Sequence, residues 1–357
     1  MMKNILLLGA GKIGIAITLL LRRTGEYKVT VADHSAAALK RFSDIGVDTL
    51  ELDINDGPAL RRAMEGQYAV LNALPFHTTA TVAYGAYDAS IHYFDLTEDV
   101  ASTRVVKEVA AKANSAFVPQ CGLAPGFVSI AAHGLAAGFD SLRDVQLRVG
   151  ALPRYPTNAL KYNLTWSTDG LINEYLNPCE AVQDGKNVEL PPLEDLEEFA
   201  LEGITYEAFN TSGGLGSLTE TLAGRVENLT YKSVRYPGHC AIIKLLVEDL
   251  RLARRRDLLK EVLEEALPIT MQDVVLVFCT VSGKRHGRLE QESIVRHIHG
   301  EEVEGQFLSA IQMSTAAGIC AMLDLHAAGH LPAKGFVRQE QMPLDLFLSN
   351  RFGKVYA

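Results

Sequence analysis

Three glycines near the N-terminus have the spacing of a turn that can hold phosphate groups. They are Gly9, Gly11 and Gly14 in the stretch LLLGAGKIG, residues 6–14. In such a turn the first glycine permits a tight bend, the second lets the backbone approach a pyrophosphate, and the third lets a helix pack closely on a strand. The N–H groups and partial positive charge at the start of that helix attract phosphates. Backbone contacts to a phosphate are therefore also expected from Lys12 and Ile13.

An acidic residue stands where the ribose of a dinucleotide would need one. The run 27–32 is typical of a second strand and ends at Asp33, close to the expected spacing of about 20 residues after the glycines. A carboxylate here accepts hydrogen bonds from ribose hydroxyls and repels a 2′-phosphate, so Asp33 favours NAD, with NADP as the other possible cofactor. His34 weakens that preference. A glycine-rich turn without a ligand is the alternative, but the whole strand–turn–helix–strand unit favours a dinucleotide.

The alternation of apolar strands and helices predicts the sheet that positions this turn. Strands are expected at residues 4–8, 27–32, 49–53, 69–74, 92–96 and 116–119, and helices at 12–23, 57–65, 80–90 and 102–113. This alternation predicts an α/β fold with a doubly wound parallel sheet of the Rossmann type. Ligands bind such sheets at the carboxyl ends of the strands. Further cofactor contacts are therefore expected from Asp53, Ile54, Ala73, Leu74, Pro75 and Thr97.

After Gly126 the pattern changes to that of an inserted α+β domain with a mostly antiparallel sheet. Strands are expected at residues 145–149, 160–165, 233–236, 274–282 and 291–298, and helices around 137 and at 166–176, 240–250 and 256–266. The acidic stretch 194–203 is interpreted as a solvated connection. A long helix at 308–325 would return the chain to the first domain. We therefore expect a Rossmann domain at 1–122 and 316–357, and a substrate-binding and dimerisation domain at 123–315.

Polar residues beside glycine or proline are candidate substrate contacts, because loops often carry function. Arg235 is of the type that binds a carboxylate through two hydrogen bonds. His239 titrates near neutrality, and Asp95 follows a predicted strand, so both are candidate acids or bases. From spacing alone, an exposed arginine and a capping histidine are the simpler interpretation. The other candidate substrate contacts are Tyr236, Gly122, Pro125, Trp166, Asn210, Thr211 and Ser212.

Composition narrows the classes of partner. The chain has 357 residues, 48% of them hydrophobic, which suits two domains. A net charge of −9 argues against a nucleic-acid partner. The cysteines form no C-x-x-C pair, and His297 and His299 lack a third ligand nearby, so no disulfide framework or metal site is expected. No leader is apparent and no apolar stretch is long enough to span a membrane, so a cytoplasmic protein is expected.

Longer stretches spread over nearly the whole sequence form a set of motifs. They are GAGKIG, CGLAPGF, TWSTDGLINEYLNPCEAV, FNTSGGLG, TETLAG, YKSVRYPGH and GFVRQEQMPLDLFLSNRFG. With these motifs the chain resembles the saccharopine dehydrogenase family. The resemblance implies a Rossmann domain closed by the C-terminal helix and an inserted substrate domain. It also implies hydride transfer between NAD(P) and a C–N bond of an amino-acid substrate, with Arg235 on the substrate carboxylate.

The resemblance does not select one substrate. Saccharopine dehydrogenases carry an aspartate in a GLDPG motif, where this sequence has Ala124, and their cysteine in the next strand is missing from residues 148–151. The GLAPG form is more similar to lysine 6-dehydrogenase, so oxidative deamination of L-lysine at its ε-amino group is the leading expectation. A saccharopine dehydrogenase or a carboxynorspermidine-type reductase, which couples an amine to a carbonyl compound, is the second. A non-catalytic NAD-binding regulatory protein is the third.

Mechanism and assembly follow as expectations. A base must take a proton from the substrate ammonium before hydride leaves, and Asp95 and His239 are the candidates. The partner is expected to be a small amino acid or amine. A homodimer is expected through the antiparallel sheet, which leaves an edge or face to cover.

Overall fold

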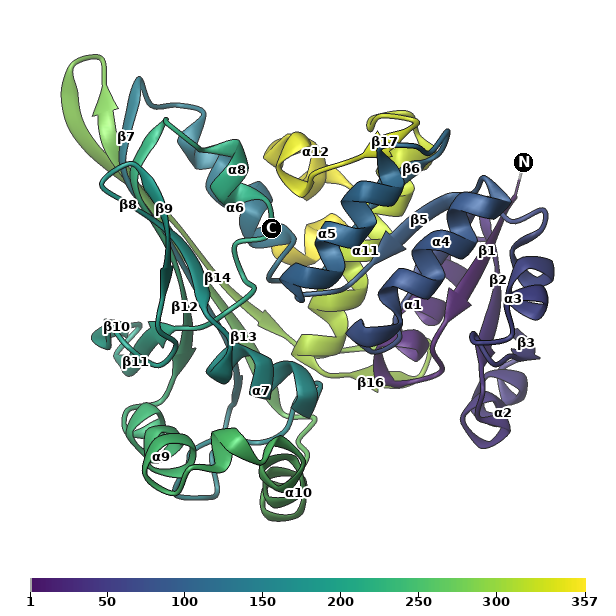
Figure 1. The fold of residues 1–357 in the computed structure, drawn as a ribbon, viewed down its shortest axis with the longest axis horizontal. Coiled ribbons are helices and arrows are strands. Elements are labelled where there is room, and N and C mark those ends of the chain that lie inside the picture. Colours follow the sequence, from purple (N-terminus) through teal and green to yellow (C-terminus); the bar gives the residue numbers. More distant parts are fainter. Residues whose placement is uncertain (1) are drawn as a thin grey trace. The chain divides into compact units, whose positions relative to one another are not determined.

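A computed structural model describes residues 2–357 as two compact units (Figure 1). The first unit comprises the chain up to Ile130 together with residues 302–308 and 312–357. The second comprises residues 131–301 and 309–311. The pattern of the sequence places the boundaries after residue 122 and before residue 316. No helix within residues 2–357 is long and apolar enough to cross a membrane.

The first unit is built on a sheet of seven parallel strands in the order β17-β6-β5-β4-β1-β2-β3. The order runs outward in opposite directions from β1 and β4, which is the Rossmann arrangement with its ligand site at the carboxyl ends near this switch point. The predicted fold class is confirmed. The strands are β1 (Lys3–Leu8), β2 (Tyr27–Asp33), β3 (Asp48–Glu51), β4 (Ala69–Asn72), β5 (His92–Asp95), β6 (Ala116–Val118) and β17 (Gly335–Phe336).

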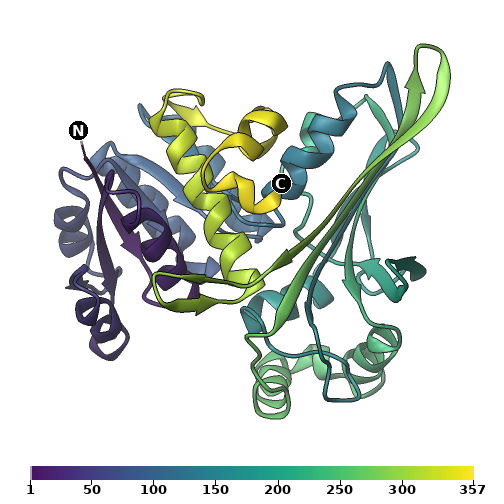
Figure 2. The same ribbon diagram turned by 180° about the vertical axis from the view of Figure 1, so that it is seen from behind.

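Helices cover both faces of this sheet. Buried side chains of α3, α4 and α5 form one core with residues of β1, β2, β4, β5 and β6, and Figure 2 shows α1 and α11 on the other face. Helix α2 was not predicted from the sequence; Ser35 caps it through the backbone N–H of Ala38. The helices are α1 (Lys12–Arg22), α2 (Ala36–Asp44), α3 (Gly57–Met64), α4 (Thr79–Ala89), α5 (Val100–Ala110), α6 (Phe127–Ala136), α11 (Ala310–Ala327) and α12 (Leu344–Ser349).

The second unit carries an eight-stranded sheet in the order β10-β11-β12-β7-β13-β14, with the β8–β9 hairpin joined to β12. Of the described pairings, β12–β7 is parallel and the others are antiparallel, as predicted. The strands are β7 (Ser141–Pro153), β8 (Cys179–Gln183), β9 (Lys186–Leu190), β10 (Glu197–Leu201), β11 (Ile204–Asn210), β12 (Val226–Arg235), β13 (Asp273–Arg285) and β14 (Arg288–His299). The short strands β15 (Glu301–Val303) and β16 (Gln306–Leu308), which fall almost wholly in the first unit, form a separate pair.

The two faces of the second sheet bury different residues. One face carries Phe209 of β11 and packs against a core that includes Leu171, Ile243 and Leu259 of the helices. The opposite face carries a smaller core around Val234. Successive strand residues point to opposite faces, so Arg235 lies on the helix-covered face. The helices of this core are α7 (Thr168–Leu176), α9 (His239–Lys244), which continues as a π-turn over Leu245–Asp249, and α10 (Arg256–Ala266), whereas α8 (Leu218–Thr221) contributes no residue to it.

Two expectations for this unit were wrong. Residues 160–165 form no strand, because Lys161 has a φ of +52° and Asn158 binds the backbone of Tyr162 in a turn. The acidic stretch 194–203 is not wholly a solvated connection. It contains β10, which pairs with β11 at the edge of the sheet. The strand has the sequence EEFAL, none of its residues is fully buried, and it follows an acidic run, so its pattern is that of a solvated segment, which explains the second error.

Candidate functional site

The three glycines of the N-terminal turn differ in what surrounds them. Gly9 has a φ of +110°, and a Cβ atom there would lie 2.8 Å from the carbonyl oxygen of Ala73. A Cβ atom at Gly14 would overlap the carbonyl oxygen of Gly9. Gly11 faces open space, with no atom within 4 Å of a Cβ position. Gly9 and Gly14 therefore shape the turn, and Gly11 leaves room for a ligand to reach the backbone.

Helix α1 begins directly after Gly11 with Lys12 and Ile13. Its N-cap is a glycine without a side chain, and its first turn contains no acidic residue. The first N–H groups of a helix have no intrahelical partner, and together with the helix dipole they attract anions. The turn therefore has the features that a pyrophosphate requires.

Asp33 is fixed at the end of β2, beside this turn. Its Oδ2 accepts a hydrogen bond from the N–H of Ala10 at 2.8 Å, and its Oδ1 accepts one from the N–H of Ser35 at 2.9 Å. The carboxylate is mostly buried, whereas the side chain of His34 is exposed. The negative charge of Asp33 therefore has a set position at the place expected for a ribose.

A cavity of about 580 Å³ in the first unit brings several of the predicted cofactor residues together. Among its lining residues are Asp33, Asp53, Ile54, Leu74 and Pro75. Ala73 contributes its carbonyl group beside Gly9 instead. Thr97 is buried in the turn after β5, where its N–H donates to Asp95. Glycine turn, carboxylate and cavity together fit an adenine dinucleotide.

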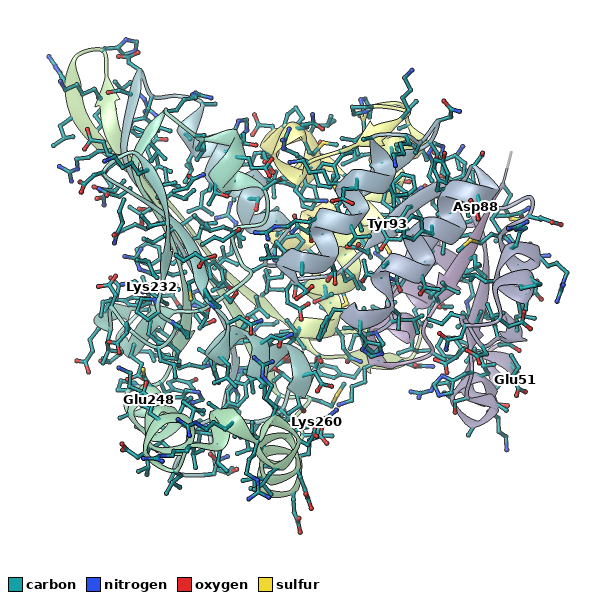
Figure 3. All side chains as sticks on the ribbon, in the orientation of Figure 1. Glu51, Asp88, Tyr93, Lys232, Glu248 and Lys260 are labelled. Atoms are coloured by element: carbon teal, nitrogen blue, oxygen red, sulfur yellow. The ribbon has the colours of Figure 1, made fainter. Side chains whose placement is uncertain are left out.

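Asp95 is a buried carboxylate with three hydrogen-bond donors. Its Oδ1 accepts from the N–H groups of Gln120 at 2.8 Å and Thr97 at 3.0 Å, and its Oδ2 accepts from the hydroxyl of Tyr93 at 2.7 Å. Tyr93, labelled in Figure 3, belongs to the core beneath α4 and α5. Burial raises the pKa of Asp95 to about 6. Asp95 therefore fixes the chain that follows β6, and its role as a proton acceptor stays a prediction.

The chain fixed by Asp95 leads into the loop Gly122–Gly126. The N–H of Phe127 donates to the carbonyl oxygen of Gly122, and the peptide bond between Ala124 and Pro125 is cis. Gly126 has a φ of +138°, and a Cβ atom there would overlap the Gly122 carbonyl. The loop is therefore tightly closed, and Gly122 and Pro125 stay predicted substrate contacts.

Arg235 is the centre of a buried polar group in the second unit. Its Nε donates to the hydroxyl of Tyr175 at 3.0 Å, its Nη1 to the carbonyl of Val234 at 2.9 Å, and its Nη2 to Oε2 of Glu174 at 3.4 Å. The ring centroid of Tyr162 lies 5.0 Å from the guanidinium carbon. A guanidinium has five N–H donors. These bonds therefore leave one N–H on each terminal nitrogen, and each can donate to a carboxylate oxygen.

His239 orients Arg235 through Tyr175. The Nδ1 of His239 lies 3.0 Å from the carbonyl oxygen of Leu160 and must donate to it, so Nε2 accepts from the Tyr175 hydroxyl at 2.9 Å. Burial, and secondly the charge of Arg235, lower the pKa of His239 to about 3. The imidazole is therefore neutral at pH 7. This geometry supports a positioning role, and an acid or base role for His239 stays a prediction.

Glu174 was not among the predicted site residues. Burial raises its pKa to about 7, against the opposing effect of Arg235. Ser233 donates to its Oε2 at 3.4 Å, and the hydroxyl of Thr211 lies 2.8 Å from that of Ser233. The available signal was an acidic residue inside the mostly apolar helix segment LINEYL, in the stretch that carries the family resemblance.

The remaining predicted substrate contacts divide into two sets. Trp166 donates to the hydroxyl of Tyr162 at 3.2 Å, and the N–H of Ser212 donates to the carbonyl of Glu174, so both adjoin the Arg235 group. Asn210 is buried beside Thr211. Tyr236 is not brought to this group. Its ring packs in the core on the opposite face of the sheet, and its hydroxyl donates to the carbonyl of Pro153.

Comparison with known proteins assigns both units to one family. Residues 5–118 match the saccharopine dehydrogenase NADP binding domain, and residues 122–349 match the saccharopine dehydrogenase C-terminal domain. The first match agrees with the dinucleotide-binding features of the first unit, with NADP as well as NAD among the cofactors to consider.

Curated relatives include the saccharopine dehydrogenases (NADP(+), L-glutamate-forming) of Schizosaccharomyces pombe, 24% identical, and Pyricularia oryzae, 25% identical. Each match covers 69% of this chain, and the chain spans 58% and 57% of the length of these relatives. The fold is shared with the apo saccharopine dehydrogenase (L-Glu forming) of Saccharomyces cerevisiae, with a TM-score of 0.79, 18% identity and 98% coverage of both chains. The chain therefore belongs to the saccharopine dehydrogenase family.

Proposed function

We propose that this protein is a nicotinamide dinucleotide-dependent dehydrogenase that acts on the C–N bond of an amino acid, with saccharopine as its substrate. The observation that carries the proposal is the buried guanidinium of Arg235, which keeps two N–H groups for a carboxylate. It stands in a chain that also has a glycine turn fitted to a dinucleotide. The relatives named above favour saccharopine over other amino acids.

The roles of the residues follow from their chemistry. The dinucleotide, when bound, supplies the site that accepts or donates hydride. Gly11 and the start of α1 would hold its pyrophosphate and Asp33 its ribose, while Arg235 holds a substrate carboxylate. The substrate nitrogen must lose its proton before the carbon bound to it loses hydride. Of the two candidate bases, Asp95 with a pKa of about 6 is better suited to accept this proton than His239 with a pKa of about 3. Water then adds to the resulting imine, and an amine and a carbonyl compound separate.

A second candidate is deamination of L-lysine at its ε-amino group. The observation that favours it is Ala124, because the Gly122–Gly126 loop then lacks the carboxylate that saccharopine dehydrogenases carry there. The two reactions differ in the amine that is released, which is an amino acid from saccharopine and ammonia from lysine.

The test is the absorbance of reduced nicotinamide when the purified protein meets NAD or NADP with saccharopine or L-lysine. We expect reduction of the dinucleotide with saccharopine, together with release of glutamate. Reduction of the dinucleotide with L-lysine and release of ammonia would instead support the second candidate reaction. Arg235→Gln should lower kcat/KM for the active substrate, whereas Arg225→Gln, a change at an exposed position, should not. Dinucleotide binding without reduction by either compound would contradict both reactions.

A further inference from the structure

Glu174 differs from the other buried carboxylates of the second unit in how it is held. Glu207 accepts from the N–H groups of Gly238 at 2.7 Å and Cys240 at 2.6 Å, and Asp273 is held by two N–H groups at the start of α11. Glu174 has two contacts, both 3.4 Å long and both to Oε2. Within residues 2–357 no hydrogen bond reaches its Oε1.

The contact between Glu174 and Arg235 is too long for a tight ion pair. Hydrogen bonds between a charged N–H and a carboxylate are usually about 2.7–2.9 Å long, and this one measures 3.4 Å. A buried carboxylate that is loosely paired bears a large desolvation cost, and burial is the first cause of its raised pKa. The side chain nevertheless keeps 12% of its surface exposed, so a small cation can reach it.

Glu174 therefore has unfilled hydrogen-bonding capacity beside the guanidinium of Arg235. Buried polar atoms are normally satisfied, so the unbonded Oε1 and the two long contacts of Oε2 leave room for a polar ligand.

We propose that Glu174 and Arg235 together recognise the head group of an α-amino acid, with Arg235 binding the carboxylate and Glu174 binding the α-ammonium. The ligand supplies a positive and a negative charge side by side, and the protein supplies the complementary pair. The proposal rests on the proposed function only in taking an amino acid as the substrate. In the absence of ligand, Glu174 is the loose counterion of Arg235.

The test compares three small ligands by titration calorimetry in the presence of NADH, which prevents oxidation. L-Lysine carries both head-group charges, 6-aminohexanoate lacks the α-amino group, and cadaverine lacks the carboxylate. The wild-type protein should bind L-lysine about tenfold or more tighter than 6-aminohexanoate, the ratio expected for one hydrogen-bonded charge. Glu174→Gln should remove this preference by weakening the binding of L-lysine and cadaverine but not that of 6-aminohexanoate. Arg235→Gln should weaken the binding of both carboxylates and leave cadaverine unaffected.

The same titrations separate this role from a purely structural one. If Glu174 only orients Arg235, Glu174→Gln will weaken L-lysine and 6-aminohexanoate equally, and that result overturns the proposal. A wild-type protein that does not bind L-lysine, or binds both ligands equally, also overturns it. Asp169→Asn, which changes an exposed carboxylate on the same helix, is the matched control and should leave all three affinities unchanged. Binding is measured without turnover, so absence of hydride transfer would contradict the proposed function and leave this result standing.

Discussion

The glycine turn allows shape and ligand binding to be separated by two substitutions. In Gly14→Ala the new methyl group would overlap the backbone carbonyl of Gly9, which cannot move aside without displacing the turn. Overpacking of this kind costs about 1–3 kcal/mol of folding free energy, which lowers the Tm by several degrees. In Gly11→Ala the methyl group meets open space, and the backbone angles of −80° and −166° suit any residue. Its Tm should stay unchanged.

In binding NADH, Gly11→Ala should be the impaired variant, although its Tm is unchanged. Gly11→Ala places a methyl group where the pyrophosphate approaches, and we expect the Kd for NADH to rise about tenfold or more, a loss of about 1.4 kcal/mol. The assay is fluorescence titration with NADH, beside thermal unfolding of the cofactor-free protein. If Gly11→Ala binds NADH as the wild type does, or loses as much stability as Gly14→Ala, the assignment of this turn is wrong.

Three further predictions concern Asp33, His239 and Glu207. NADH should bind about tenfold tighter than NADPH because the fixed carboxylate of Asp33 repels a 2′-phosphate; Asp33→Asn should narrow the ratio in fluorescence titrations, and a wild-type preference for NADPH would refute this reasoning. Burial lowers the pKa of His239 to about 3 from an ordinary 6.5. The contribution of this group to folding stability is therefore complete above pH 6.5 and is lost as the pH falls towards 3, by up to about 1.4 kcal/mol per pH unit. In urea unfolding, His239→Gln should flatten this acid dependence and His330→Gln, at an exposed position, should not; equal slopes in both would count against it. Glu207→Gln should lower the Tm and raise the KM for substrate, because it weakens the two charge-assisted bonds from Gly238 and Cys240, which flank His239. Such bonds contribute about 1.5–3 kcal/mol each. Glu198→Gln, at an exposed position, is the control, and similar effects in both variants would refute this prediction.

The Rossmann unit was predictable because its signals are local. Buried parallel strands are continuous apolar runs, and the glycine turn and Asp33 lie within one strand–helix–strand segment. The sheet order, however, depends on β17, a strand of two residues near the C-terminus, which has no pattern of its own. Helix α2 was missed because it is short and buries only two of its residues, Leu39 and Phe42, which is too few to give a clear helical period.

The Arg235 group was only half predictable. Arg235 stands in a motif that the family resemblance marks, but Glu174 is 61 residues away in sequence and meets it through the packing of α7 on the sheet. Successive strand residues point to opposite faces of the sheet, so Tyr236 packs in the core of the face opposite to the one that carries Arg235. Burial, which sets the pKa values of Glu174 and His239, is likewise a property of the fold that spacing does not show.

The most direct test of the proposed reaction follows one hydrogen atom. Saccharopine and L-lysine, each deuterated at the carbon whose bond to nitrogen is cleaved, would be incubated separately with the protein and oxidised dinucleotide. We expect deuterium from saccharopine to appear in the reduced nicotinamide ring, as measured by mass spectrometry. Label from lysine alone would select the second candidate reaction. Reduced dinucleotide without label, or no reduction with either substrate, would contradict hydride transfer from the C–N carbon.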